Sequence, residues 1–74
     1  MKMPPAVSCL MGSSWTSDAP LDGWRHFHVV QISRSDEAWV VELAASCDEK
    51  RRVQATSRAL LQREGWRPGW ASLR

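Results

Sequence analysis

The stretch Ala38–Ala45, with the sequence AWVVELAA, constrains the fold more than any other part of the chain. Apolar residues occupy every second position, and the charged Glu42 falls between them. A period of two, in residues that suit a pleated surface, predicts a β-strand with one buried face. That face is expected to carry Trp39, Val41, Leu43 and Ala45. The rest of the chain is expected to cover this strand or to turn away from it.

Residues 24–33 form a second predicted strand. Phe27 and Val29 share one of its faces. The other face is expected to hold His26, His28, Val30 and Ile32. Because both faces are partly apolar, the pattern favours a strand that curls within a small barrel over one in a flat, one-sided sheet.

Residues 51–55 form a third predicted strand, with Val53 and Ala55 facing the interior. Polar breaks of hairpin length at residues 34–37 and 46–50 separate the three runs. Three strands joined by two short loops predict an antiparallel meander.

Residues 1–12 contain proline and glycine without a sustained period, and they are interpreted as a flexible leader. Residues 13–74 are interpreted as a single small β domain. Trp15 and Thr16 favour a short first strand, and residues 17–23 carry turn-forming residues throughout.

A short helix is predicted at residues 58–64, with Ser57 as its N-cap. Gly65 is expected to take the left-handed position after the helix. Trp66 would then contact Leu61, the hydrophobic contact that accompanies a Schellman ending.

Pro68 and Gly69 are expected to turn the chain and to bring Trp70 near Trp66. The fold class that follows is mainly β, a small antiparallel meander of three to four strands with a short C-terminal helical turn. Its layout resembles SH3-like or Tudor-like small barrels. A chain of 74 residues has only a marginal core, and the five tryptophans are expected to supply most of it.

Landmark residues between positions 10 and 70 resemble a family of small tryptophan-rich bacterial proteins of unknown function. The matching residues are Leu10 to Thr16, Pro20, Arg25 to Val29, Arg51 or Arg52, Arg58 with Leu60, and Trp66 to Trp70. Ser57 departs from the pattern, which has a tryptophan there, and Trp24 or Trp39 is expected to fill that space. The resemblance implies a compact fold and brings no catalytic residues.

The net charge of +2 is unevenly distributed. Residues 1–49 carry three basic and seven acidic residues, whereas residues 50–74 carry seven basic residues and one acidic residue. A basic half with interleaved indoles can bind a phosphate backbone and stack bases. The predicted binding residues are Arg51, Arg52, Arg58, Arg63, Trp66, Arg67 and Trp70.

The preferred function is a non-catalytic binding module for an anionic partner, RNA or single-stranded DNA. Two other interpretations stay open. The same arginines and tryptophans can be structural, with Trp66 packed at the helix end and Arg67 lying over an indole. Alternatively, unpaired strand edges beside Trp24 or Val30 can support a protein-interaction module or a homodimer.

Other classes of function have little support. His26, His28 and Cys47 are ligand types that suit zinc, but a closed site needs four ligands and no second paired motif is present. Cys47 lies beside two acidic residues, which disfavours a catalytic thiolate. Neither catalysis nor a metal or other cofactor is therefore predicted.

The predicted location is the cytoplasm. Cys9 and Cys47 are interpreted as free thiols in a reducing compartment. No apolar run approaches the roughly 20 residues of a membrane span, and the first residues do not form a signal peptide.

Overall fold

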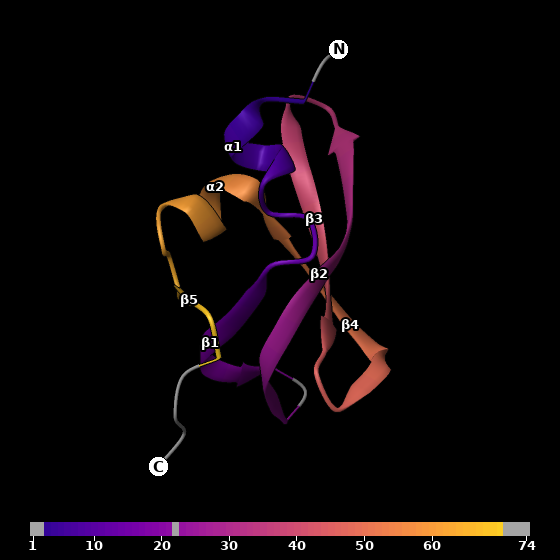
Figure 1. Cartoon of the computed structure of the whole chain (residues 1–74), viewed down its shortest axis with the longest axis vertical. Coiled ribbons are helices and arrows are strands. Elements are labelled where there is room, and N and C mark those ends of the chain that lie inside the picture. The colour runs from indigo at the N-terminus through magenta and orange to yellow at the C-terminus, as the bar shows by residue number, and fades with distance from the viewer. Residues whose placement is uncertain (1–2, 22, 71–74) are drawn as a thin grey trace.

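A computed structural model describes residues 3–21 and 23–70, which form one antiparallel sheet of five strands with two short helices (Figure 1). The strands lie in the order β4-β3-β2-β1-β5. In chain order the elements are α1 (Pro5–Ser8), β1 (Ser14–Leu21), β2 (Trp24–Ser35), β3 (Ala38–Ala45), β4 (Asp48–Thr56), α2 (Ser57–Leu61) and β5 (Trp66–Pro68).

The prediction of a mainly β fold with a short C-terminal helical turn is confirmed. The sheet has five strands rather than three to four, because β1 is long and the chain after α2 adds β5. The sheet is open: β4 and β5 lie at opposite edges, so the described strands do not close into a barrel. The helix α2 makes the connection between those two edge strands (Figure 1).

The strand predicted at Ala38–Ala45 is present with the same bounds, as β3. Leu43 pairs with Val29 of β2 on one side and with Val53 of β4 on the other. Leu43 is fully buried, and Val53 packs against the core, as the alternation predicts. Trp39 is half-buried at the start of the strand.

A β-bulge in β2 corrects the predicted face of Ile32. Val29 pairs with Leu43, and the next pair joins Gln31 to Glu42, which leaves Val30 as an extra residue. One extra residue reverses the alternation of every position that follows it. Ile32 therefore lies on the same face as Val29 and packs against the core, rather than sharing a face with the histidines.

Two predicted turns are shorter than expected. Strand β1 continues to Leu21 through most of the stretch predicted as turn, residues 17–23. Strand β4 begins at Asp48, inside the turn predicted at residues 46–50. The pairs of Ser17 with Trp66, Leu21 with Trp24 and Asp48 with Ala45 extend the two strands into these stretches.

The core lies on one face of the sheet, where Trp66 packs edge-on against Phe27 with ring centroids 5.7 Å apart. Trp15 is buried beside them, and Leu60 of α2 reaches the same cluster. Tryptophan therefore supplies much of the core, although only two of the five rings are buried.

The N-terminal stretch contributes to packing. Within the predicted leader, residues 1–12, the described part begins at Met3 and contains α1. Val7 and Leu10 are each 5% exposed, so side chains of this stretch lie against the domain. The predicted domain, residues 13–74, is described up to Trp70, and residues 71–74 lie outside the described part of the chain.

Helix α2 differs from its prediction at both ends. Its N-cap is Thr56, whose hydroxyl accepts a hydrogen bond from the Ala59 N–H at 3.1 Å, and Ser57 is the first helical residue. The helix ends at Leu61. Arg63, with φ of 56°, is the left-handed C′ residue in place of Gly65; Gly65 is left-handed as predicted, with φ of 83°, but lies two residues further on.

The helix ends in a Schellman motif. The Glu64 N–H donates to the Ala59 carbonyl at 2.8 Å, and the Arg63 N–H donates to the Leu60 carbonyl at 3.1 Å. The prediction of Trp66 as the C″ residue is wrong, because Glu64 takes that position; Leu61 is 46% exposed, and Trp66 packs on Phe27.

Replacing the true cap should destabilise the protein more than replacing the predicted one. Thr56→Ala removes the hydroxyl that satisfies the Ala59 N–H, and a lost N-cap costs about 1 kcal/mol. Ser57→Ala removes no helix cap and should have a smaller effect. Urea unfolding of both variants measures the difference, and a larger loss for Ser57→Ala would contradict the assignment of the cap.

Candidate nucleic-acid interface

The outer face is the side of the sheet opposite the core. Direct cross-strand pairs put Arg67 of β5 next to Thr16 of β1, and Thr16 next to His26 of β2. Residues directly opposite each other in a sheet share a face. Trp70 belongs to this face as well, because its ring stacks on His26.

A second row of the outer face runs through β4, β3 and β2. Arg52 pairs with Ala44, and Ala44 pairs with His28. The Arg52 guanidinium contacts the Glu42 carboxylate at 2.7 Å, and His28 Nε2 lies 3.9 Å from the Glu49 carboxylate. This row carries charged groups of both signs.

Trp70 is the most exposed tryptophan in the described chain, and it is held in place by two contacts. Its exposed fraction is 52%. The indole Nε1–H donates to the Phe27 carbonyl at 2.9 Å, and the ring centroid lies 6.0 Å from that of His26 with 23° between the planes. An aromatic ring that is exposed but fixed is a suitable stacking surface.

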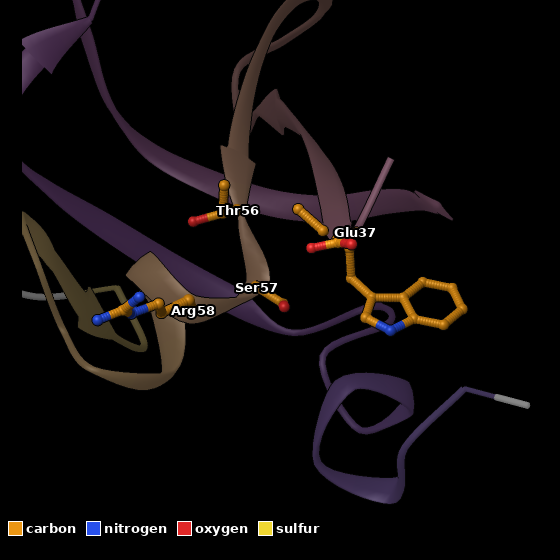
Figure 2. Close-up of a pocket in the computed structure, with 6 residues that line it drawn as sticks. Glu37, Thr56, Ser57 and Arg58 are labelled. Carbon is orange, nitrogen blue, oxygen red and sulfur yellow. The ribbon is translucent and has the colours of Figure 1, made fainter. Parts of the chain in front are cut away.

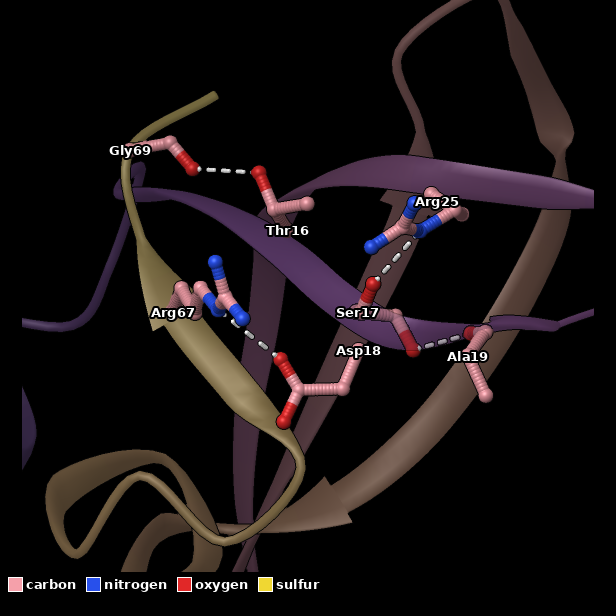
Figure 3. A network of polar contacts seen from close by, with 7 residues as sticks. All are labelled: Thr16, Ser17, Asp18, Ala19, Arg25, Arg67 and Gly69. Carbon is pink, nitrogen blue, oxygen red and sulfur yellow. Dashed lines mark hydrogen bonds and ion pairs between the residues drawn. The ribbon is translucent and has the colours of Figure 1, made fainter. Parts of the chain in front are cut away.

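The chain that precedes Trp70 is fixed to β1. The Thr16 hydroxyl donates to the Gly69 carbonyl at 2.8 Å (Figure 3). The Gly69 N–H donates to the Ser14 carbonyl at 2.8 Å. Gly69 has φ of 79°, a left-handed conformation that glycine adopts without steric cost. The backbone therefore changes direction here and delivers Trp70 to the outer face.

The arginines beside this site are engaged in polar contacts (Figure 3). Arg67 Nε lies 3.2 Å from the Asp18 carboxylate, and Arg25 Nε donates to the Ser17 carbonyl at 2.9 Å. The excess of basic residues in the C-terminal half is thus partly neutralised by carboxylates from the N-terminal half.

The seven residues predicted to bind do not share one face. Arg52, Arg67 and Trp70 lie on the outer face, and Trp66 is a core residue at 7% exposure. Arg51 Nε lies 3.7 Å from the carboxylate of Asp48, three residues earlier in β4.

The two remaining predicted arginines belong to the helical turn. Arg58 lies in α2, and Arg63 follows it in the Schellman turn. Because α2 points Leu60 into the core, this turn covers the core side of the sheet. The prediction therefore combined residues from both sides of the protein.

Two aromatic contributions were missed. His26 supports Trp70 by stacking, although its sequence neighbourhood indicated only a weak metal ligand. The Arg34 guanidinium lies over the Trp39 ring, 5.2 Å from its centroid, and the two residues are direct cross-strand partners in the β2–β3 hairpin. Equal spacing of Arg34 and Trp39 from the tip of the hairpin is the signal that could have indicated this pair.

No group of three His, Cys, Asp or Glu side chains within residues 3–21 and 23–70 is arranged to hold a metal ion. Cys9 and Cys47 are both exposed, free thiols. No helix in the described part of the chain is long and apolar enough to span a membrane.

A family model for tryptophan-rich proteins, DUF2389, matches residues 13–71. The chain therefore belongs to this family, whose function is unknown, and the resemblance to a small tryptophan-rich family is confirmed. Comparison with curated proteins and with solved structures gives no match.

The two C-terminal tryptophans should contribute unequally to stability. Trp66→Ala removes a buried ring, and truncation of a core Phe or Trp typically costs about 3–5 kcal/mol. Trp70→Ala removes a half-exposed ring and should cost clearly less. The free energy of unfolding in urea gives both values, and equal losses would contradict the division into a core ring and a surface ring.

Proposed function

We propose that the protein is a non-catalytic binding module that contacts single-stranded RNA or DNA through its outer face. The observation that supports this most is Trp70, an exposed indole fixed by the Phe27 carbonyl and the His26 ring. A fixed ring loses little conformational entropy when a base stacks on it. Every base has a π-face, so stacking at Trp70 gives affinity without strict sequence preference.

Arg67 and Arg52 would supply the phosphate contacts of this interface. Each is exposed and each is paired with a carboxylate, Asp18 for Arg67 and Glu42 for Arg52. A phosphate must compete with these carboxylates, and we therefore expect moderate affinity that falls as salt rises.

Self-association is the alternative function, and the sheet edges support it less well. The edge strand β4 carries the charged run Asp48 to Arg52. The opposite edge strand, β5, has three residues and ends in Pro68. Charges, proline and short length all discourage edge-to-edge pairing. A homodimer through another surface stays a second prediction.

We also propose a bacterial, cytoplasmic setting. The two exposed thiols, Cys9 and Cys47, are typical of a reducing compartment.

Trp70→Ala should weaken the binding of a short labelled single-stranded oligonucleotide by about 1–3 kcal/mol, because one stacked base is lost. Fluorescence anisotropy at low salt measures this. Met11→Ala is the matched control, since Met11 is another exposed large apolar residue, 54% exposed, outside this interface. Absence of binding by the unmodified protein, or equal affinity of Trp70→Ala, would refute the proposal.

Two substitutions in one ion pair should change the affinity in opposite directions. Arg67→Ala removes a phosphate contact, and it should weaken binding and lower the salt slope by about one. Asp18→Asn removes the competing carboxylate and should strengthen binding. Asp48→Asn, which affects the Arg51 pair instead, should leave the affinity unchanged. Weakening by Asp18→Asn would contradict competition between this carboxylate and phosphate, and an unchanged affinity of Arg67→Ala would show that Arg67 does not contact phosphate.

A further inference from the structure

A cavity of about 390 Å³ lies where β3 begins and β4 runs into α2 (Figure 2). Its size is within the usual range of small-molecule sites. It is separate from the outer face, since none of the residues that define that face line it. The lining residues are Glu37, Ala38, Trp39, Thr56, Ser57 and Arg58.

The indole of Trp39 forms the aromatic wall of this cavity. The Arg34 guanidinium lies 5.2 Å from the ring centroid, so a cation–π contact holds the ring in position. Arg34 is the direct cross-strand partner of Trp39, which fixes that contact within the hairpin. Trp39 is half-buried, and it remains accessible from the cavity.

Unused hydrogen-bonding groups line the rest of the cavity. Among the described residues no ion pair or hydrogen bond engages the Glu37 carboxylate or the hydroxyl of Ser57, a residue that is 8% exposed. The Thr56 hydroxyl accepts from the Ala59 N–H, which leaves its own hydrogen free to donate. Figure 2 shows the Arg58 side chain extending away from Glu37, so these two charges do not neutralise each other.

The charged side chains that line the cavity indicate the class of ligand that it can bind. A simple cation would meet the guanidinium group of Arg58, and a simple anion would meet the carboxylate of Glu37. A neutral planar ring with several donors and acceptors suits an indole wall and hydroxyl groups, and nucleobases have these properties. Among the bases, guanine alone presents two adjacent donors, N1–H and the 2-amino group, which one carboxylate accepts together.

We propose that this cavity binds a guanine base, with its ring stacked on Trp39 and its two adjacent donors bonded to the Glu37 carboxylate. The Arg58 side chain lines the cavity and extends away from Glu37, with its Nε 3.5 Å from Gln62 Oε1, and it would attract the attached phosphate. The base belongs either to a free guanine nucleotide or to a single strand. This proposal does not depend on the function proposed for the outer face.

The test is a titration of the isotope-labelled protein with guanosine monophosphate and with adenosine monophosphate, followed by the Trp39 indole N–H resonance. We expect guanosine monophosphate to shift that resonance and to bind about tenfold more tightly, roughly 1.4 kcal/mol. Glu37→Gln should abolish this preference, because an amide presents only one acceptor. The control Glu64→Gln makes the same charge change at an exposed residue outside the cavity and should keep the preference.

The proposal is overturned if neither nucleotide shifts the Trp39 resonance, or if Glu37→Gln retains the full preference for guanine. A short single strand with one guanine separates the two sources of the base. Binding at least tenfold tighter than the mononucleotide assigns the base to a strand, and equal binding assigns it to a free nucleotide; both outcomes support the guanine site.

Repeating the titration with Trp70→Ala separates the two proposals. Loss of oligonucleotide binding with an unchanged Trp39 response would locate strand binding on the outer face and leave the cavity site intact. An unchanged Trp39 response together with undiminished oligonucleotide binding would refute the outer-face proposal alone.

Discussion

The packing of Trp66 against Phe27 is the contact on which the arrangement of the C-terminal half depends. Strand β5 has only three residues, and its backbone pairing with β1 is correspondingly short. The edge-on contact of the two rings, 5.7 Å between centroids, adds a large apolar surface to that pairing. Burial of a tryptophan removes about 150–250 Å² from water, worth roughly 4–6 kcal/mol at 25 cal/mol per Å². We infer that side-chain burial, more than backbone pairing, holds this edge strand.

The connection between β4 and β5 positions Trp66 for its contact with Phe27. Thr56 caps α2 at its start, and the Schellman turn at Arg63 ends it after little more than one turn. The short helix places Leu60 in the core and reverses the chain toward β1. With Trp66 inside, the backbone change at Gly69 carries Trp70 to the other face of the sheet. The position of the exposed ring is therefore a consequence of the position of the buried one.

The central strands could be predicted from the sequence because their side chains alternate. Ala38–Ala45 has one charged residue among apolar ones, and Val53 is flanked by polar residues, so each pattern fits only one face. The change of face after the bulge at Val30 could not be predicted. Val30 and Ile32 are both apolar, and the bulge is fixed by pairing with β3. The length of β1 could not be predicted, because the pairs that extend it beyond Thr16, Ser17 with Trp66 and Leu21 with Trp24, depend on strands brought together by the fold.

The candidate interface was predicted in part. The composition of the C-terminal half predicted that arginine and tryptophan side chains form the interface. It could not show on which side of the sheet each side chain lies. Trp66 and Trp70 are four residues apart, an even spacing that would put both rings on one face of a regular strand. The strand ends at Pro68 and Gly69 turns left-handed, so the rings separate. Carboxylates that neutralise the arginines come from distant positions, such as Asp18 for Arg67, and only the fold brings them together.

The separation of the two rings can be measured directly by proton NMR in solution. Nuclear Overhauser contacts are expected between the rings of Trp66 and Phe27 and between those of Trp70 and His26, with none between the two tryptophans. Contacts of Trp66 with Trp70 or with Leu61 in place of Phe27 would contradict the account, because the buried edge strand and the exposed stacking surface would then both be misplaced.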